Sequence, residues 1–186
     1  MTAQIMWKDS IRLIKSFKTS GTITPSSPRL IKRLLAPIDF QSSQCIIELG
    51  PGNGCVTKAL LDRMNDDCQL ICFELNPEFV TELSLIDDPR LKIVNACASS
   101  IRECLDDLSI GQVDHVVSSL PLALIDSEMV DTILQSVGNN LKTGGYFQQY
   151  QYSLKNYSDM KPMFSDVKLR FTLRNVPPAF VYECMK

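Results

Sequence analysis

Two hydrophobic periodicities alternate along most of the chain. Short runs between turn residues, most of them apolar, predict strands at residues 45–49, 69–74, 91–95, 112–118 and 146–153. Helical spacing fills the stretches between them, at residues 53–64, in a segment opened by Asn76 and Pro77, at 100–108, and from Asp126 or Ser127 to 141. Strands that alternate with helices predict a parallel sheet covered on both faces.

The end of the chain breaks this alternation. A short helix is predicted at residues 158–164, followed by strands at 167–174 and 179–184. The connection between these two strands is too short for a parallel crossover, so we expect an antiparallel pair. The predicted fold is therefore α/β and Rossmann-like, with a seven-stranded, mostly parallel sheet that ends in an antiparallel hairpin.

The start of the chain is amphipathic and basic. Residues 4–18 place Trp7, Ile11, Ile14 and Phe17 at helical spacing, with lysines and an arginine close by. A second helix is predicted at 29–36, capped by Ser26 or Ser27, with Pro28 at its first position.

Composition describes one domain with an uneven charge. The 186 residues carry a net charge of −2, yet residues 1–40 hold seven Lys/Arg against two Asp, a net of +5 that leaves −7 for the rest. A basic leading segment on an acidic body favours an anionic partner. No run reaches the roughly 20 apolar residues of a membrane span, and charges interrupt the N-terminus where a signal peptide would be apolar. The seven cysteines form no CxxC pair, which favours reduced, buried thiols in a cytoplasmic protein and predicts no metal site.

A glycine-rich loop joins the first predicted strand to the next helix. It reads ELGPGNG over residues 48–54, and Glu74 ends the following strand about 20 residues later. Glycines let the backbone turn tightly and approach a ligand, and a carboxylate at the second position can accept hydrogen bonds from ribose hydroxyls. Dinucleotide-binding loops read GxGxxG, whereas this pattern resembles the signature of methyltransferases that bind S-adenosylmethionine.

We assign cofactor binding to the loop and to the residues that follow neighbouring strands. An aspartate usually contacts the adenine after the third strand, but this chain has Asn95 and Ala96 there, which leaves that contact to the backbone and Asn95. The assigned residues are Glu48, Gly50, Pro51, Gly52, Asn53, Gly54, Glu74, Leu75, Asn76, Asn95, Ala96 and Ser118.

The segment after the fourth strand bears on the acceptor. Enzymes that methylate base amines carry Asn/Asp-Pro-Pro-Tyr or Asn-Leu-Pro-Tyr here, so that the first residue accepts from the amine and the ring stacks on the base. In this chain Ser119 replaces the Asn and Leu122 replaces the aromatic residue. The turn is kept while most of the base-reading chemistry is absent. This counts against a nucleic acid as the methyl acceptor.

Together these segments resemble one family, the bacterial phospholipid N-methyltransferases, which are class I enzymes related to the ribosomal RNA adenine dimethyltransferases. The resemblance runs over nearly the whole chain, through 21–27, 48–54, 74–76, 118–122, Gly144-Gly145, Gln149 with Tyr152, and 175–179. It implies a cytoplasmic enzyme that docks on the inner face of the membrane through residues 4–18 and methylates phosphatidylethanolamine and its methylated intermediates. The alternative acceptors are another aminolipid, such as an ornithine lipid, and an RNA adenine. A third alternative is a protein that binds the cofactor without catalysis. Nothing in the sequence points to an obligate protein partner.

The resemblance also implies roles for individual residues. Residues 1–40 are interpreted as amphipathic helices and a cofactor lid that includes Thr24, Pro25 and Ser26, with the methyltransferase part at 41–186 of a single domain. Tyr152, Ser119 and Pro121 are the predicted catalytic residues, and the predicted substrate-binding residues are Gln149, Tyr150, Arg174 and Asn175. Within the fourth strand, Asp114 and His115 are predicted to be structural.

Overall fold

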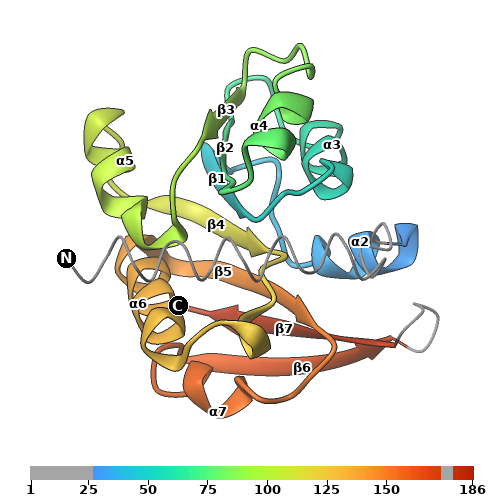
Figure 1. The fold of residues 1–186 in the computed structure, drawn as a ribbon, viewed down its shortest axis with the longest axis vertical. Helices are drawn as coiled ribbons and strands as arrows, with labels where there is room; N and C mark the ends of the chain where they lie inside the picture. The colour runs from blue at the N-terminus through green and yellow to red at the C-terminus, as the bar shows by residue number, and fades with distance from the viewer. Residues whose placement is uncertain (1–26, 173–177) are drawn as a thin grey trace.

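A single seven-stranded sheet runs through the molecule. The computed structural model describes residues 27–172 and 178–186, and its strands lie in the order β3-β2-β1-β4-β5-β7-β6 (Figure 1). Strands β1 to β5 pair in parallel, and β7 pairs antiparallel with both β5 and β6. The predicted α/β fold with a C-terminal antiparallel hairpin is confirmed. The strands are β1 Cys45–Leu49, β2 Gln69–Phe73, β3 Leu91–Val94, β4 Val113–Ser118, β5 Leu141–Gln151, β6 Asp166–Thr172 and β7 Ala179–Met185.

Side-chain caps begin three of the helices. Ser27 accepts a hydrogen bond from Leu30 N, Asn76 from Glu78 N and Asp126 from Glu128 N, so each satisfies a backbone donor that the first turn leaves unpaired. The α-helices are α2 Pro28–Leu34, α3 Cys55–Leu61, α4 Pro77–Leu83, α5 Ile101–Asp107, α6 Ser127–Asn140 and α7 Tyr157–Met160, with 3-10 turns η1 Ala98–Ser100 and η2 Leu122–Leu124.

One boundary differs clearly from the expectation. Residues 142–145 were expected to form a turn, but β5 already begins at Leu141. The register between β4 and β5 shifts between Val113 and His115, and Gly144 has a φ of 80°. A bulge of this kind absorbs the glycine and lets pairing continue through it.

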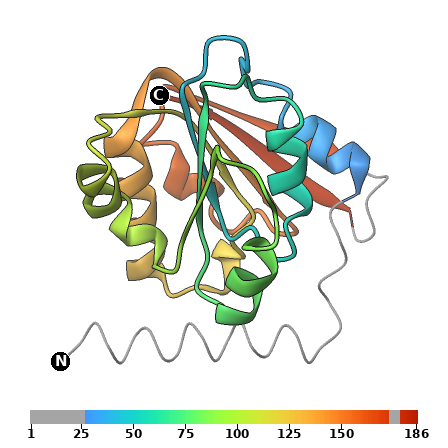
Figure 2. The ribbon, with the colours of Figure 1, turned by 90° about the horizontal axis from the view of Figure 1, so that it is seen from above.

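Two apolar layers enclose the sheet. Side chains of α2 and α3 pack on one face against residues such as Ile46, Val117 and Val181. Side chains of α5, α6 and α7 pack on the other face against residues such as Ile47, Val116 and Phe147. Figure 2 shows the two helical layers on opposite sides of the sheet. This is the arrangement that a parallel sheet needs, because both of its faces are apolar.

Asp114 and His115 support the amino-terminal edge of the sheet. Asp114 accepts hydrogen bonds from Gln44 N and Cys45 N and contacts Lys142. Burial alone would raise the pKa of Asp114, but these partners outweigh it and lower the pKa. The buried His115 accepts from Tyr146 N through Nδ1, and burial lowers its pKa. Both residues therefore have the structural role that the sequence predicted.

The cysteines are unpaired, as the sequence predicted. All seven cysteines are free thiols, and burial raises the pKa of Cys45 and Cys184 to about 12. Among residues 27–172 and 178–186, no group of His, Cys, Asp and Glu could hold a metal ion. Within the same ranges, no helix combines the length and apolar character required to cross a bilayer.

Candidate active site

The carboxyl ends of the parallel strands bring the predicted site residues to one edge of the sheet. Leu49 at the end of β1 lies beside Phe73 of β2 and Ser118 of β4, and Ser118 lies beside Gln149 of β5. Gly50 N donates to Phe73 O at 2.9 Å, and Ser119 N donates to Leu49 O at 2.9 Å. The glycine loop is thus bonded to β2, and residues 119–123, which we call the β4 exit, are bonded to β1. Open α/β sheets bind ligands at this edge.

The glycine loop needs glycine for two different reasons. Gly50, Gly52 and Gly54 all have φ values between 55° and 77°, a region that other residues rarely adopt. A Cβ at Gly50 would lie 2.8 Å from Leu120 Cδ2, so this glycine allows the β4 exit to pack closely. A Cβ at Gly52 would meet no atom of the described residues within 4 Å. Among these residues, the space above Gly52 is therefore open to a ligand that approaches the backbone.

Glu74 lies beside this open space. Its Oε2 accepts from Gly52 N at 3.1 Å and its Oε1 accepts from Asn76 N at 2.8 Å. Burial raises the pKa of Glu74, while the backbone donors oppose that rise. A carboxylate held at the rim of an open glycine loop suits a nucleoside, because its remaining lone pairs can accept from ribose hydroxyls. These residues fit S-adenosylmethionine, which supplies an electrophilic methyl group when it is bound.

The Glu48 carboxyl lies inside the molecule. It is fully buried, and its Oε2 accepts from Thr57 Oγ1 at 2.7 Å and from the Cys72 thiol at 3.4 Å. Burial raises its pKa to about 7. Its Oε1 has no partner among the described residues. The side chain thus joins β1 to α3 beneath the loop, and its direct contact with a cofactor stays a prediction.

The remaining cofactor residues surround Glu74 and the loop. Asn76 caps α4, and the exposed Asn95 donates to Glu74 O at 2.8 Å, so both position the segment that carries Glu74. Leu75 and Ala96 are half-buried beside them. In the loop itself Pro51 is buried, and the exposed Asn53 accepts from Cys55 N at the start of α3.

Two buried glutamines hold the β4 exit. Gln149 Nε2 donates to Leu120 O at 2.9 Å and to Tyr150 O at 2.6 Å, and Gln151 Oε1 accepts from Ala123 N at 3.1 Å. Because both partners of Gln149 are carbonyls, its amide nitrogen must face them. This leaves its Oε1 without a partner among the described residues, and likewise Gln151 Nε2. Both of these amide atoms are buried behind the loop that contains Ser119 and Pro121, and contact of Gln149 with the substrate stays a prediction.

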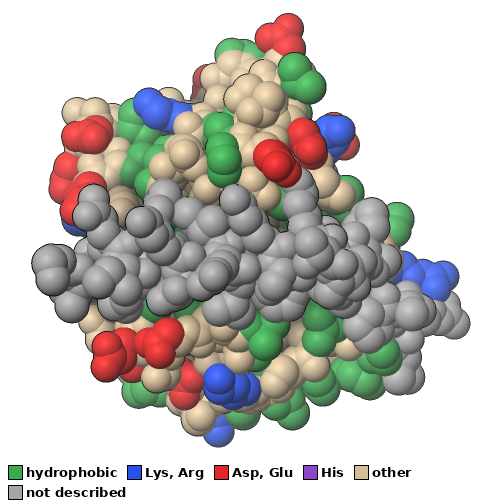
Figure 3. Space-filling model, in the orientation of Figure 1, with side chains coloured by type: hydrophobic (Ala, Val, Ile, Leu, Met, Phe, Trp, Pro, Cys, Tyr) green, Lys and Arg blue, Asp and Glu red, His purple; other side chains and the backbone are tan. Residues whose placement is uncertain are grey.

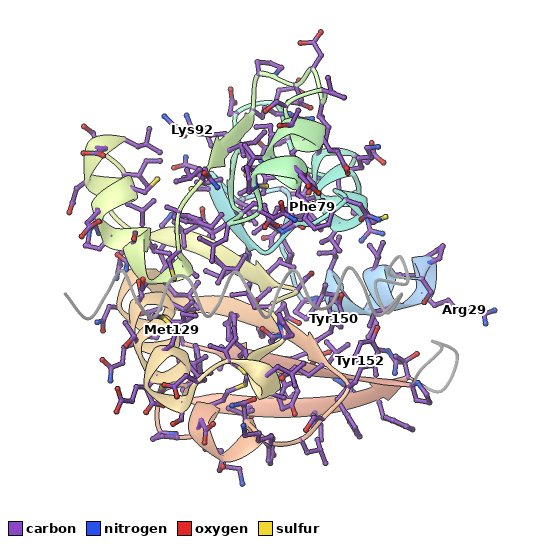
Figure 4. The ribbon with its side chains drawn as sticks, in the orientation of Figure 1. Arg29, Phe79, Lys92, Met129, Tyr150 and Tyr152 are labelled. Atoms are coloured by element: carbon purple, nitrogen blue, oxygen red, sulfur yellow. The ribbon has the colours of Figure 1, made fainter. Side chains whose placement is uncertain are left out.

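On the other face of β5 two tyrosines lie together. The Tyr150 and Tyr152 rings meet edge to face, 6.1 Å apart, and Figure 4 shows them at the end of β5 beside α2. Tyr150 is half-buried and Tyr152 is 46% exposed. Tyr150 packs against the core on the α2 side of the sheet, whereas Gln149 and Gln151 bond to the segment after β4, as the alternation of side chains along a strand requires. Such a pair presents aromatic edges and faces to anything that enters at this end of the strand.

Two glutamines of this strand were not singled out by sequence reasoning. Gln148 is fully buried, and neither of its amide atoms has a partner among residues 27–172 and 178–186. Gln151 was placed on the correct face, but its hold on η2 was missed. The available signal was compositional, since a strand in the middle of the sheet reads QQYQY where its neighbours are apolar.

Some predicted residues fall outside the described ranges. These are the helix at 4–18, the lid residues Thr24, Pro25 and Ser26, and the substrate residues Arg174 and Asn175. Their assignments stay predictions, as does the division of the chain at residue 40.

Comparisons with known proteins agree with the fold and the loop. Residues 25–155 match the family described as "Ribosomal RNA adenine dimethylase". An ornithine lipid N-methyltransferase of Singulisphaera acidiphila is 29% identical over 184 residues, which cover 95% of this chain and 96% of that protein.

Solved methyltransferase structures share the architecture at low sequence identity. A precorrin-6y C5,15-methyltransferase of Geobacter metallireducens superimposes with a TM-score of 0.70 at 15% identity, over 89% of this chain and 93% of that one. A Burkholderia thailandensis 1,6-didemethyltoxoflavin-N1-methyltransferase with bound S-adenosylhomocysteine gives a TM-score of 0.71 at 13% identity, over 99% and 88% of the two chains. Likeness at this level of identity establishes the fold alone.

Proposed function

This chain belongs to the ribosomal RNA adenine dimethylase family and is an S-adenosylmethionine-dependent N-methyltransferase, and from that premise we propose that its acceptor is the amine of a membrane aminolipid. The proposal separates the chain from the base-methylating enzymes after which the family is named. It rests chiefly on the segment that leaves β4.

The β4 exit lacks a platform for a base. Leu122, at the position where related base-methylating enzymes carry an aromatic residue, is fully buried in the core beneath α6. Ser119 stands where those enzymes have the amine-binding Asn, and its backbone nitrogen is bound to Leu49 O. No side chain at this turn can therefore stack on an adenine. This is the observation that carries the proposal.

Similarity to a lipid-modifying enzyme supports the same acceptor class. The relative of Singulisphaera acidiphila, named as an ornithine lipid N-methyltransferase, aligns over almost the full length of both chains. This favours an ornithine lipid among the aminolipids. Phosphatidylethanolamine, the acceptor predicted from the sequence, remains the second candidate, because its headgroup presents the same primary amine.

The site contains groups that suit an amine acceptor. Methyl transfer to nitrogen needs a neutral amine whose lone pair points at the methyl group, so positioning supplies much of the rate. The fully buried Gln149 donates to Leu120 O and so positions the segment after β4, beside which the amine would enter. Tyr150 and Tyr152 can attract the cation that forms as methyl groups accumulate. Proton removal from the ammonium falls to water, to an anionic group of the lipid or to Tyr152.

Label transfer tests the acceptor directly. The full chain and labelled S-adenosylmethionine are incubated with phosphatidylglycerol vesicles that contain ornithine lipid, with vesicles that contain phosphatidylethanolamine, and with ribosomal RNA. We expect label in the ornithine lipid, with phosphatidylethanolamine labelled more slowly. Label in the RNA alone would overturn the proposal, and label in phosphatidylethanolamine alone would restore the acceptor predicted from the sequence.

We also propose that the enzyme acts at the cytoplasmic face of the membrane, with residues 4–18 as one contact. The net charge of +5 in residues 1–40 supports this, because anionic headgroups attract basic segments at a membrane surface.

A further inference from the structure

Large hydrophobic side chains are exposed mainly at one place on the described surface. Among residues 27–172 and 178–186, six large hydrophobic residues are exposed, and one of them, Leu85, lies in the loop between α4 and β3. The other five belong to η2, to residues 152–155 after β5, which we call the β5 exit, and to β6. They are Leu124, Tyr152, Leu154, Leu169 and Phe171, with exposed fractions between 37% and 48%. We call these five residues the apolar rim.

The apolar rim lies on the side of the molecule where the methyl group is transferred. Leu124 follows the β4 exit, and Tyr152 and Leu154 follow the end of β5. Strand β6 is antiparallel to β7, which is antiparallel to β5, so β6 ends at the same edge as β5. Phe171 is next to the last residue of β6. Figure 3 shows hydrophobic side chains over β6 and β7, with Lys and Arg side chains beside α2.

Hydrogen bonds hold the segments of the apolar rim together. Lys155 Nζ donates to Ala123 O at 3.1 Å and joins the β5 exit to η2. Tyr182 Oη donates to Ser153 O at 2.7 Å and joins the β5 exit to β7. The Phe171 ring packs on Phe180 with centroids 4.8 Å apart. The exposed side chains therefore stand on a preformed surface and need little ordering before they bind.

Cationic side chains lie near this surface. Helix α2 contributes the exposed Arg29, Lys32 and Arg33 and contains no acidic residue. Arg33 Nη1 donates to the backbone Phe171 O at 2.7 Å, which places the guanidinium at the end of β6, on the face of the sheet opposite the Phe171 ring. Lys155 is exposed at the β5 exit. Aromatic and leucine side chains beside Lys and Arg match the boundary between acyl chains and anionic headgroups.

We propose that the apolar rim docks on an anionic lipid bilayer, with its side chains in the acyl boundary and the α2 cations on lipid phosphates. The inference deepens the proposed function and rests on it for its direction, since a lipid amine reaches the cofactor most directly if this edge faces the membrane. It concerns a second membrane contact in addition to the one proposed for residues 4–18. Area also favours a bilayer, because five side chains with cations nearby form a smaller apolar surface than a stable dimer needs.

Vesicle flotation with rim variants tests the docking surface. The full chain is mixed with vesicles of phosphatidylcholine and phosphatidylglycerol, which contain no aminolipid, so binding is measured apart from methyl transfer. We expect the Leu154→Ser, Phe171→Ser double variant to bind at least about tenfold more weakly than the unmodified chain, because both side chains leave the acyl boundary. The matched control is Leu85→Ser, which removes an 81% exposed leucine away from the rim and should bind as the unmodified chain does.

Three outcomes would overturn the inference. The first is full vesicle binding by the double variant. The second is a loss of vesicle binding in Leu85→Ser as large as that in the double variant. The third is a dimer of the unmodified chain in gel filtration that the rim variants break while vesicle binding is unchanged. Cofactor affinity and melting temperature confirm that each variant is folded. If the double variant fails to fold, the single Leu154→Ser change in the loop after β5 gives the same test. Normal vesicle binding together with methylation of RNA alone would contradict the proposed acceptor and leave the docking surface intact.

Discussion

At the scale of single residues, the three glycines of the loop do different work although they share one backbone conformation. Gly50 makes room for Leu120, whereas Gly52 faces open space. A side chain at either position is strained by the positive φ, but only the one at position 50 would also collide with Leu120. One glycine serves the packing of the β4 exit and the other serves the ligand.

A matched pair of alanine substitutions tests this division. We expect Gly52→Ala to weaken S-adenosylmethionine binding by about tenfold or more, since the added methyl group fills the cradle at a modest cost of about 1–2 kcal/mol in stability. Gly50→Ala should be the less stable variant, because its Cβ also displaces Leu120. Calorimetric binding and urea unfolding measure the two effects. Equal losses of affinity and stability in both variants would contradict the assignment.

The buried carboxyl of Glu48 gives a prediction in pH. Its pKa of about 7 in the folded chain lies above the ordinary value of 4.5. Its stabilising contribution is therefore full below pH 4.5 and is lost as the pH rises to 7. Glu48→Gln removes this titration, so the variant should gain stability relative to the unmodified chain across that window, by roughly 3 kcal/mol.

Urea unfolding at several pH values between 4.5 and 8 measures the Glu48 effect. Glu103→Gln on α5 is the control, because that carboxyl is exposed and solvated in both states. A difference between Glu48→Gln and the unmodified chain that stays constant with pH would show that the Glu48 carboxyl does not titrate in this range.

At the scale of elements, β5 carries or adjoins several of the predicted substrate and catalytic residues. Gln149 and Gln151 on one face hold the β4 exit, while Tyr150 and Tyr152 occupy the other. Gln149 is a positioning residue for this exit, because its Nε2 holds Leu120 O. This role predicts that changes at Gln149 affect methyl transfer to the acceptor and leave the affinity for the cofactor unchanged.

Gln149→Leu keeps the side-chain volume and removes the amide. We expect kcat to fall by about tenfold to a hundredfold with labelled aminolipid vesicles, because a misplaced exit disturbs alignment. The dissociation constant of S-adenosylmethionine should change little. Gln69→Leu, at the exposed start of β2, is the control and should leave both values unchanged. A parallel loss of cofactor affinity in Gln149→Leu would contradict the positioning role.

The opposite edge of the sheet contributes stability without touching the site. Asp114 joins the starts of β1, β4 and β5 through Gln44, Cys45 and Lys142. Asp114→Ala leaves two backbone donors unpaired, so we expect a loss of about 2–3 kcal/mol in the free energy of unfolding, with cofactor affinity unchanged in the folded protein.

The control for Asp114 is a surface pair. Asp166→Ala breaks the exposed contact with Lys168 and should cost under about 0.5 kcal/mol. Urea unfolding compares the two variants. Similar costs would mean that the Asp114 bonds are not maintained in solution.

At the scale of the whole molecule, the predicted cofactor residues and the proposed membrane contact lie at different parts of one edge. The glycine loop and Glu74 lie at the ends of β1 and β2, while the apolar rim lies at the ends of β4 to β6. A membrane contact can therefore be weakened without disturbing the cofactor site.

Deleting residues 1–18 tests this separation from the other end of the chain. We expect activity on aminolipid vesicles to fall further than S-adenosylmethionine affinity, since this segment is proposed to contact the membrane and precedes the lid residues. Vesicle assays and calorimetry measure the two quantities. An equal fall in both would contradict the assignment of residues 1–18 to the membrane.

Local signals in the sequence accounted for the elements and for the cofactor loop. Asn76 was recognised as a cap, and Ser27 and Asp126 were each one of two candidates, because side chains of these types bond to backbone donors two or three residues away. Strand β1 was placed at its observed bounds, since an apolar run followed directly by glycines has few alternatives. The bulge in β5 was missed because it depends on the register with β4, which is not encoded within the run itself.

By itself, the sequence determined the α/β fold, the S-adenosylmethionine loop and its Glu74 landmark, because each depends on spacing between near neighbours in the chain. Tertiary structure alone decided that the Glu48 carboxyl is buried against Thr57, that Gln149 and Gln151 each leave one amide atom free beside the β4 exit, and that exposed hydrophobic residues of three segments meet at one edge. These features join residues that are distant in sequence. Burial and pairing of that kind arise only when the sheet has assembled and its strand ends share an edge.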